Sequence, residues 1–516
     1  MSQYDKDLHT YLRKIFKHDN FQEGQKEIIT DILKGNDVLG ILRTGSGKSL
    51  CYQLPAIMLP GVTIVVSPLI SLMIDQVRQV KSYYYKEVVA IHSFQNIEER
   101  RKILSRLSYY KLIYVSPELL QQEEFIRTLQ KIEVSLVVID EAHCISQWGY
   151  DFRPDFLRLT NVIKDLGNPS ILALTGTATP EVQQDIIINL DRQAMKRHIY
   201  PMDRENISLL LYRVNGSEDD KLNHLSSLIS TYQQPTIVYF SSRKLTEKIA
   251  SILLQRIPDK KIAYYHGGME NNDRLKIQQQ FMNEQLDVIC CTSAFGMGIN
   301  KKNIRLVIHY HLPTQIESYI QEIGRAGRDG KESLSILLYK EGDIHVPLQI
   351  IENELPTEKE IAFVMNQLYL LYQKGKAIIP TSDDKLEEIF QLSITKWRFL
   401  HYQFESHGMM KGNIIQFDKK HWQEIFQKIN RFCTIRRNLK YERLDELINW
   451  VNSKDCLRNE LYKSFQHKVP KKDAQCCSNC GFSFEKWEKS LHPIKKEEIN
   501  TSSWQHQLAD LLLIGE

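Results

Sequence analysis

The stretch VLGILRTGSGKS at residues 38–49 joins an apolar run to a glycine-rich turn. The apolar run is typical of a buried strand, and the residues after the turn favour a helix. Glycines let the backbone wrap closely around a phosphate, so that several N–H groups and a helix N-terminus point at the anion. Lys48 then supplies a positive charge for the β- and γ-phosphates, and Ser49 supplies a hydroxyl for Mg²⁺. We expect six residues to hold a nucleotide here: Thr44, Gly45, Ser46, Gly47, Lys48 and Ser49.

The loop follows a variant of the phosphate-loop pattern, because Leu42 stands where the strict pattern has glycine. A glycine-rich surface turn is the alternative interpretation of such a segment. The strand predicted directly before the loop counts against that alternative.

Helical and strand patterns alternate around this loop. Residues 1–36 predict two amphipathic helices, and the amide of Gln25 in the second of them can recognise an adenine edge, although an ordinary surface glutamine is the alternative. Four apolar segments rich in β-branched residues predict strands at residues 63–67, 112–116, 136–140 and 171–175. Because strands that alternate with helices form parallel sheets, we expect ligands at the carboxyl ends of these strands.

The segment VVIDEAH at residues 137–143 carries a second group of candidate site residues. Asp140 ends an apolar strand, where a carboxylate can hold Mg²⁺ directly or through water. Glu141 beside it can orient or deprotonate an attacking water molecule. An acidic turn at a strand end is the alternative, but the phosphate loop upstream favours a catalytic pair.

The following residues extend this segment to DEAHCISQWGYDFRP, residues 140–154. This string resembles motif II and the aromatic-rich loop of RecQ-family DNA helicases of superfamily 2. VSPLISLM at residues 66–73 and LALTGTAT at residues 172–179 are similar to motifs Ia and III of that family. Four residues of the loop offer stacking faces and a cation to single-stranded DNA, and these are Trp148, Tyr150, Phe152 and Arg153. The alternative is that the aromatic rings belong to the core.

From about residue 205 the alternation begins again, with strands predicted at residues 236–240, 261–265, 288–292 and 306–310. This half repeats no phosphate loop. Instead, the segment QEIGRAGRDG places Arg325 and Arg328 three residues apart on one face of a short helical turn. A guanidinium delivered across a cleft can neutralise charge on a transferring γ-phosphate, although a solvated basic turn is the alternative. The segment resembles RecQ motif VI, which implies that both arginines complete an ATP site.

Three further segments of this half are similar to motifs IV, IVa and V of the family, at residues 241–243, 265–269 and 292–300. The chain departs from the family pattern at Asn300, where aspartate is usual, and at Gln22, where an arginine often precedes the motif 0 glutamine. Neither departure removes an essential charge.

The C-terminal third carries weaker signals. Residues 385–390, 394–407 and 412–417 predict a helix, a longer helix and a short strand. This order suits a winged-helix module, with Trp397 and Arg398 on or near the helix that faces a duplex. The alternative is a helical linker whose aromatic side chains fill its own core.

The cysteines near the C-terminus suggest a metal site. The chain has nine cysteines, and an odd count without an evident leader argues against a disulfide framework. RecQ proteins carry a zinc-binding helical hairpin with one cysteine followed by three at two-residue gaps, and here Ser483 occupies the last position. The resemblance therefore implies that Zn²⁺ is bound by Cys456, Cys476, Cys477 and Cys480, with Cys476 as the substitute ligand. A three-ligand site or plain buried thiols are the alternatives.

The bulk properties set wider limits. With 516 residues the chain is too long for one hydrophobic core, so about three or four domains are expected. Its net charge of +4 allows a polyanionic partner. The sequence has neither a run of 18 apolar residues nor a basic-then-apolar leader, so we expect a cytoplasmic protein, in the bacterial cytoplasm or nucleoid, with no membrane partner.

Together these observations predict an α/β fold with two RecA-like parallel-sheet lobes and a mainly helical C-terminal region. We expect an ATP-binding lobe at residues 1–204, a second lobe at 205–345, a helical or winged-helix module at 346–430, a zinc-binding hairpin at 431–495 and a tail at 496–516. Only 36 residues follow Cys480, so no further compact domain is expected there.

The resemblance implies an enzyme that hydrolyses ATP with Mg²⁺ and unwinds DNA in the 3′→5′ direction during recombination and repair. Its expected partners are single-stranded DNA, tailed or branched duplexes, and single-strand-binding and recombination proteins. Two alternatives stay open: an RNA helicase, and a protein that clamps branched DNA and uses ATP only as a switch.

Overall fold

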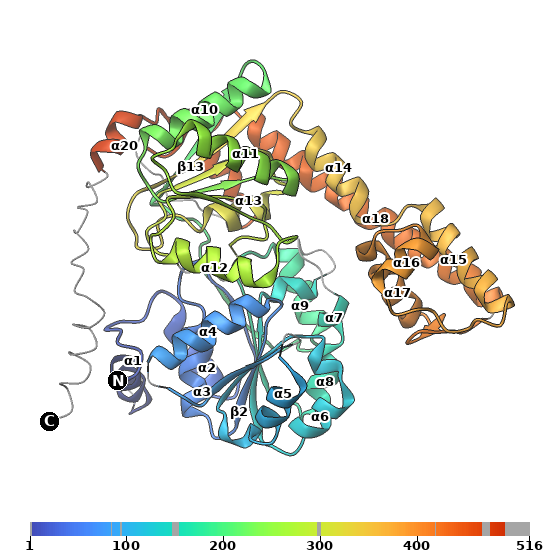
Figure 1. The fold of residues 1–516 in the computed structure, drawn as a ribbon. Coiled ribbons are helices and arrows are strands. Elements are labelled where there is room, and N and C mark those ends of the chain that lie inside the picture. The colour runs from blue at the N-terminus through green and yellow to red at the C-terminus, as the bar shows by residue number, and fades with distance from the viewer. Residues whose placement is uncertain are drawn as a thin grey trace.

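The structure is a computed structural model that describes residues 3–83, 85–92, 95–146, 154–296, 301–417, 419–466 and 475–490. Two α/β lobes stand one above the other, and a helical region extends to one side of them (Figure 1). None of the helices in these ranges combines the length and the apolar character needed to cross a membrane.

The first lobe is built on a seven-stranded sheet in which every paired strand is parallel to its neighbour. Its strands are β1 (Val38–Ile41), β2 (Val62–Val66), β3 (Val88–Ile91), β4 (Leu112–Val115), β5 (Val134–Asp140), β6 (Ser170–Thr175) and β7 (Lys196–Ile199). Their order across the sheet is β3-β4-β2-β5-β6-β1-β7. The helices around it are α1 (Gln3–Lys14), α2 (Gln25–Leu33), α3 (Leu50–Met58), α4 (Ile70–Ser82), α5 (Ile97–Leu104), α6 (Glu123–Leu129), α7 (Pro154–Leu157), α8 (Leu159–Asp165) and α9 (Pro180–Asn189).

The strands predicted for this lobe are confirmed as β1, β2, β4, β5 and β6, and the two N-terminal helices as α1 and α2. A strand of a parallel sheet is covered on both faces and therefore forms a continuous apolar run, which makes it visible in a sequence. The sequence analysis misses β3 and β7, which form the two edges of the sheet. The residues of β7, Lys-Arg-His-Ile, are exposed or half-buried, so they show no such run.

The second lobe repeats this plan with a six-stranded parallel sheet. Its strands are β8 (Ile207–Val214), β9 (Thr236–Tyr239), β10 (Ile262–Tyr265), β11 (Val288–Cys291), β12 (Leu306–His309) and β13 (Ser333–Lys340), in the order β10-β11-β9-β12-β13-β8. Its helices are α10 (Glu218–Thr231), α11 (Arg243–Arg256), α12 (Asn271–Met282) and α13 (Ile316–Ile323). The four predicted strands are confirmed as β9 to β12, so the two RecA-like lobes predicted from the sequence are present.

The remainder of the chain is mainly helical, as predicted. It contains α14 (His345–Glu354), α15 (Glu358–Gln373), α16 (Asp383–Phe390), α17 (Ile394–Ser406), the antiparallel pair β14 (Met410–Lys411) and β15 (Ile414–Ile415), α18 (Lys419–Asn452), α19 (Leu457–Tyr462) and α20 (Phe484–Ser490). The 34-residue helix α18 runs from the outlying module back to the second lobe, beside α14 (Figure 1). The boundary expected between residues 430 and 431 falls inside this helix.

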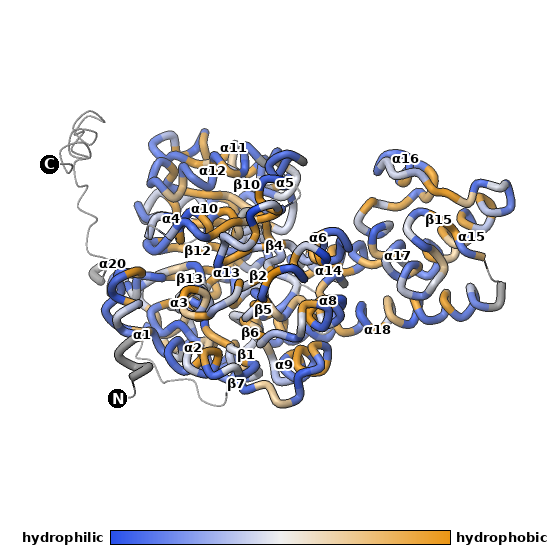
Figure 2. Tube along the Cα trace, turned by 90° about the horizontal axis from the view of Figure 1, so that it is seen from below, coloured by the Kyte–Doolittle hydropathy of each residue, from blue (hydrophilic) through white to orange (hydrophobic). Residues whose placement is uncertain are grey.

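Helix α18 has a separate core at each end. Its first half packs Trp422, Ile425 and Ile429 into the core of the outlying module. Its last turns pack Leu447 and Trp450 into the core that the two lobes share. Figure 2 shows hydrophobic and hydrophilic residues alternating along α18, as expected for a helix that buries one stripe.

The outlying module contains the predicted helix, turn, longer helix and short strand as α16, α17 and the β14–β15 pair. Trp397 lies on α17, the longer of the two helices, but its ring is buried and stacks on Phe390, with 4.1 Å between the ring centroids. An indole is mostly apolar surface, so the core takes it, as the alternative interpretation held. Arg398 is exposed and pairs with Asp383 at 2.9 Å. The module touches the first lobe where Arg158 lies over the ring of Tyr402, 5.1 Å from its centroid.

Candidate active site

The phosphate loop connects β1 to α3 at the carboxyl edge of the first sheet. Gly45 and Gly47 have φ angles of 88° and 68°, which other residues adopt only with strain. A Cβ atom on Gly47 would lie 2.8 Å from Nε2 of Gln25. A Cβ atom on Gly45 would lie 3.1 Å from Arg204 and 3.1 Å from Arg328. The loop is thus packed from both sides, and the two glycines are required by conformation and by space.

Gln25 supports this loop directly. Its Nε2 donates to the carbonyl oxygens of Ser46 (2.8 Å) and Gly47 (3.0 Å), and its Oε1 accepts from the backbone N–H of Gln22 (2.9 Å). The side chain is buried. Its Nε2 is used to shape the phosphate loop and its Oε1 binds the segment before α2, and the expected role of this amide at an adenine edge stays a prediction.

Asp140 and Glu141 follow β5 beside the loop. Burial, together with the charge of Glu141, raises the pKa of Asp140 to about 7, and the charge of Lys48 opposes this shift. Glu141 has a left-handed backbone with φ of 51°, which is unusual for a residue other than glycine. Such strain at a strand end is typical of sites where the direction of a side chain matters more than stability.

His143 links the acidic pair to the end of the neighbouring strand. Its Nδ1 lies 2.9 Å from Oγ1 of Thr175 and 3.5 Å from a carboxylate oxygen of Glu141. Thr175 in turn donates to the carbonyl oxygen of Thr177 at 3.1 Å. Strands β5 and β6 pair in register, so these side chains follow neighbouring strands at one edge of the sheet. The two strand-end segments therefore form one hydrogen-bonded unit.

The second lobe contributes its arginines to the same place. A Cβ atom on Gly324 would lie 3.1 Å from Cβ of Thr44, so the segment after α13 packs directly on the phosphate loop. Burial lowers the pKa of Arg328 to about 9, and the nearby charges of Arg325 and Arg204 add to the shift. An anion placed among these cations would relieve their repulsion, which favours a phosphate here.

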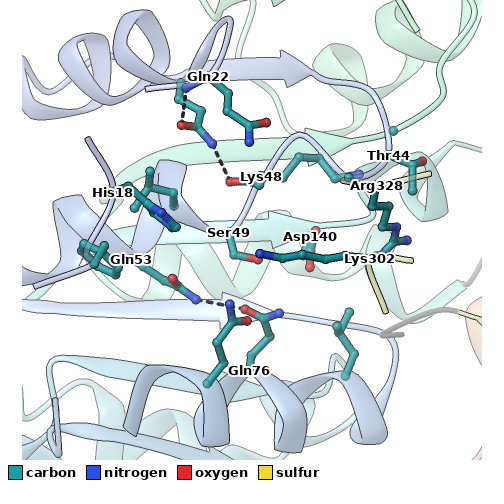
Figure 3. A pocket seen from close by; sticks show the side chains of 18 of the residues that line it. His18, Gln22, Thr44, Lys48, Ser49, Gln53, Gln76, Asp140, Lys302 and Arg328 are labelled. Atoms are coloured by element: carbon teal, nitrogen blue, oxygen red, sulfur yellow. Dashed lines mark hydrogen bonds between the residues drawn. The ribbon is translucent and has the colours of Figure 1, made fainter. Parts of the chain in front are cut away.

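One cavity of about 570 Å³ between the lobes joins these groups. Of the residues expected from the sequence, its wall includes Gln25, Thr44, Gly45, Gly47, Lys48, Ser49, Asp140, Glu141, Arg325 and Arg328. The side chain of Ser46 is buried outside this wall. Figure 3 shows Lys48, Ser49 and Asp140 from the first lobe facing Arg328 and Lys302 from the second.

Four cysteine sulfurs meet in the C-terminal region. The Sγ atoms of Cys456, Cys476, Cys477 and Cys480 all lie within 4.8 Å of one another. Four thiolates around one zinc ion at about 2.3 Å would lie roughly 3.8 Å apart, so this donor set fits zinc. The hydrogen bond between Cys476 and Cys477 lowers the pKa of Cys477 and raises that of Cys476. Ser483 is not part of the group, and its N–H donates to Oε1 of Gln475 at 3.3 Å.

Two family models match the two lobes of this chain. The model of the DEAD/DEAH box helicases matches residues 22–186, and the model of the helicase conserved C-terminal domain matches residues 220–330. The chain is 40% identical over 514 residues to the probable ATP-dependent DNA helicase RecS of Bacillus subtilis, covering 99% of each chain. It is 42% identical over 358 residues to the ATP-dependent DNA helicase RecQ of the same organism, covering 68% of this chain and 59% of the relative. This chain belongs to the RecQ family.

Solved structures agree with the two-lobe fold. The helicase Lhr of Mycobacterium smegmatis, bound to single-stranded DNA and AMP-PNP, superposes with a TM-score of 0.55 at 21% identity, over 78% of this chain and 57% of that one. The DEAD-box helicase Mss116, bound to single-stranded RNA, superposes with a TM-score of 0.57 at 17% identity, over 86% of this chain and 91% of that one. At this identity the likeness supports the RecA-like architecture alone.

Some expected RecQ features lie outside the described residues. These are the DNA-binding candidates Trp148, Tyr150, Phe152 and Arg153, the departure at Asn300 and the tail at 496–516. The departure at Gln22 is described, and Gln22 lines the cavity and donates its N–H to Gln25.

Four residues at this RecQ-family site were missed by the sequence analysis. Gln53 and Gln76 join across the cavity floor by a hydrogen bond of 2.9 Å, and Lys302 points from the second lobe toward Ser49 (Figure 3). The fourth, Arg204, donates hydrogen bonds to Thr44 of the first lobe and Gly324 of the second. Isolated glutamines, lysines and arginines are usually surface residues, so no pattern along the chain could have singled these four out.

Proposed function

We propose that this RecQ-family chain is an ATP-dependent DNA helicase whose hydrolysis site is the cavity between the lobes. The observation that carries the proposal is the convergence of a phosphate loop, an acidic pair and two arginines from opposite lobes on one cavity. The match to a probable DNA helicase over 99% of both chains supports DNA as the nucleic acid.

Each site residue has a proposed role. Lys48 binds the β- and γ-phosphates, and Ser49 and Asp140 hold Mg²⁺, which supplies charge neutralisation on the phosphate oxygens. Glu141 orients the attacking water and accepts its proton. The guanidinium groups of Arg325 and Arg328 neutralise the charge that develops during phosphoryl transfer.

Unwinding requires this chemistry to move the lobes. We propose that closure of the cavity on ATP, and its opening after hydrolysis, step the protein along one DNA strand. The aromatic-rich loop with Trp148, Tyr150, Phe152 and Arg153 binds that strand. The protein moves along it in the 3′→5′ direction, as the family resemblance implies. Action on tailed and branched duplexes, partnership with single-strand-binding and recombination proteins, and a role in repair rest on the same resemblance.

The first experiment measures steady-state ATP hydrolysis with single-stranded DNA, with RNA of matched sequence and with no polymer. Strong stimulation by DNA alone supports the proposal, and displacement of a strand from 3′-tailed and 5′-tailed duplexes then tests polarity. A Lys48→Ala variant gives the background. Equal or greater stimulation of hydrolysis by RNA contradicts the proposal of a DNA helicase. DNA-stimulated hydrolysis without strand displacement favours a protein that clamps branched DNA and uses ATP as a switch.

An RNA helicase is the second candidate. A putative ATP-dependent RNA helicase of Acanthamoeba polyphaga mimivirus is 38% identical over 377 residues, covering 72% of this chain. The full-length match to a probable DNA helicase weighs more, because it includes the cysteine hairpin region.

We also propose that the four cysteines hold one structural Zn²⁺, with Cys476 replacing the ligand that Ser483 does not supply. Metal analysis of purified protein should give about one zinc per chain, and the zinc content should be lower in the Cys477→Ser variant. Less than about half an equivalent in wild-type protein would contradict the site. In the proposed division, lobe 1 is residues 1–204, lobe 2 is 205–345, a helical or winged-helix module is 346–430, the hairpin is 431–495 and the tail is 496–516, with α18 shared between the module and the hairpin.

A further inference from the structure

Arg204 lies in the segment between β7 and β8, and its side chain is buried between the lobes. Its two terminal nitrogens make four hydrogen bonds to backbone carbonyls. Nη1 donates to Thr44 at 3.0 Å and to Gly324 at 3.4 Å. Nη2 donates to Ala326 at 3.2 Å and to Gly327 at 2.5 Å. One side chain therefore joins the start of the phosphate loop to the segment that carries the second-lobe arginines.

The direction of these bonds defines what Arg204 can do. A guanidinium has five N–H groups, and the fifth, on Nε, faces Oδ1 of Asn206 at 3.4 Å. All five donors are thus directed at protein oxygens, and none is left for a phosphate. The guanidinium nevertheless lies next to the phosphate loop, because a Cβ atom on Gly45 would lie 3.1 Å from Nη1 of Arg204. Arg204 sets the spacing between the two halves of the site rather than binding its ligand.

A second buried arginine also binds this same segment, through its backbone carbonyl groups and Asp203. Arg458, on α19, has 1% of its surface exposed. Its Nη1 donates to the carboxylate of Asp203 and, at 3.1 Å, to the carbonyl oxygen of Arg204. Its Nη2 donates to the carbonyl oxygen of Ile207. Its Nε lies 3.3 Å from Sγ of Cys476, so it also contacts the cysteine cluster.

The cysteine segment itself is fixed to the second sheet. The N–H of Leu209 in β8 donates to the carbonyl oxygen of Cys476 at 3.1 Å, and the hydroxyl of Ser208 donates to that of Gln475 at 2.6 Å. Since β8 is the edge strand of its sheet, the hairpin closes this edge next to the segment that holds Arg204. A continuous set of contacts therefore runs from the cysteine cluster to the phosphate loop.

We propose that Arg204 is a positioning residue for ATP hydrolysis, which holds the phosphate loop against residues 324–328, and that Arg458 fixes Arg204 in place from the cysteine cluster. The C-terminal hairpin is thereby a structural part of the ATP site, although none of its described residues lines the cavity. The inference rests on the proposed hydrolysis of ATP in that cavity.

The conservative change to lysine tests this role. Lysine keeps the charge but has a single ammonium group, which cannot reach four carbonyl groups on two lobes. In Arg204→Lys, we expect kcat for DNA-stimulated hydrolysis to fall about tenfold or more, because small misplacements of catalytic groups have large effects on rate. The KM for ATP should change less than about threefold, since the first lobe keeps its phosphate loop. A residue with only a structural role would lower the melting temperature and leave kcat of the folded protein unchanged.

Arg458→Lys should reproduce the loss of kcat in a milder form, about fivefold, because Arg204 keeps its own hydrogen bonds. The matched control is Arg213→Ala. Arg213 also ties the hairpin region to β8, through a 2.7 Å hydrogen bond to the carbonyl oxygen of Val451, but contacts neither Arg204 nor Arg458. This control should retain wild-type kcat. If Arg458→Lys does not fold, Asp203→Asn replaces it, because it weakens the same ion pair without changing shape.

Hydrogen exchange gives a readout that does not depend on catalysis. Without nucleotide, Arg204→Lys should speed amide exchange at residues 324–330 and in the phosphate loop, while β12 exchanges as in the wild type.

Wild-type kcat in a folded Arg204→Lys variant would overturn the proposal. A loss in Arg204→Lys with wild-type kcat in both Arg458→Lys and Asp203→Asn would overturn the connection to the hairpin. If wild-type protein hydrolyses no more ATP than Lys48→Ala, the proposed function fails. The exchange data would then still test whether Arg204 holds the phosphate loop against residues 324–328.

Discussion

The two lobes share one architecture and contribute different chemistry. In the first lobe, the functional side chains follow β1, β5 and β6, so they meet at the carboxyl edge of a parallel sheet. In the second lobe, the groups that reach the cavity come mainly from the turn after α13. The first lobe provides a lysine, a hydroxyl and two carboxylates, whereas the second provides three cations and one carboxylate, Asp329, which is paired with Arg305.

This difference shows that the RecA-like plan supplies a scaffold, and that the loops attached to it determine what each copy does. The second-lobe arginines are also buried beside one another, which lowers the pKa of Arg328. A triphosphate bound by the first lobe would add negative charge beside these cations. The lobes are therefore complementary in function: a nucleoside triphosphate bound by the phosphate loop of the first lobe would also neutralise the arginines of the second.

The largest expected effect comes from removing the first-lobe cation. Lys48→Ala should reduce DNA-stimulated ATP hydrolysis by about 10⁴-fold, because Lys48 serves both binding and the transition state. Lys244→Ala, which removes an exposed lysine from α11 of the second lobe, is the control and should be neutral. Substantial hydrolysis in Lys48→Ala would mean that the phosphates lie elsewhere.

Removing a second-lobe arginine should separate catalysis from binding. In Arg328→Ala, hydrolysis should fall by about 10³-fold, as arginines that act across a cleft contribute mainly to the transition state. Binding of a fluorescent ATP analogue should weaken much less. An equal loss of affinity and rate would contradict the division of roles between the lobes. The exposed Arg256 of α11, changed to alanine, controls for the loss of a charge.

Glu141→Gln should keep nucleotide binding and lower kcat by about 10²-fold, because the amide cannot accept the proton of the attacking water. Single-turnover hydrolysis measures this step directly. Glu181→Gln, an exposed change in α9 of the same lobe, is the control. Near-normal turnover in Glu141→Gln would mean that another group orients and deprotonates the attacking water.

The smallest effect should come from the contact surface between the lobes. Gly45→Ala should raise the KM for ATP about tenfold, because the new methyl group needs a left-handed backbone and meets Arg204 and Arg328. Gly330→Ala is the matched control, since Gly330 has φ of 81° and nothing within 4 Å of the added methyl. Equal effects of both changes would attribute the loss to backbone strain alone.

The site was partly predictable because much of it is encoded in short strings. The phosphate loop, the Asp140–Glu141 pair and the Arg325–Arg328 pair each depend on residues a few positions apart. Their approximate placement also follows from the sequence, since parallel strands bring their carboxyl ends to one edge. Nine of the strands were visible as apolar runs, namely β1, β2, β4, β5, β6 and β9 to β12, whereas the buried strands β3 and β13 were missed. The edge strand β7 was missed because its exposed and half-buried residues form no such run.

Other features depend on packing and could not be predicted from local patterns. Trp397 resembled a surface residue of a recognition helix, yet the module needed its ring to fill the core beside Phe390. The amide of Gln25 contacts the backbone of the phosphate loop, a contact that the sequence did not indicate. In both cases the partner lies on another element, and the tertiary fold decides which contact is made.

The sequence by itself determined which chemical groups this protein carries: a phosphate loop, an acidic pair at a strand end, two arginines three residues apart and four cysteines, all recognisable from residue type and spacing. Only the tertiary structure decided how these parts are joined. Arg204 reaches Thr44 across 160 residues, and Arg458 reaches Arg204 across 254. Such contacts have no periodicity and no local composition, because they arise when separately folded lobes and a hairpin bury the same segment between them.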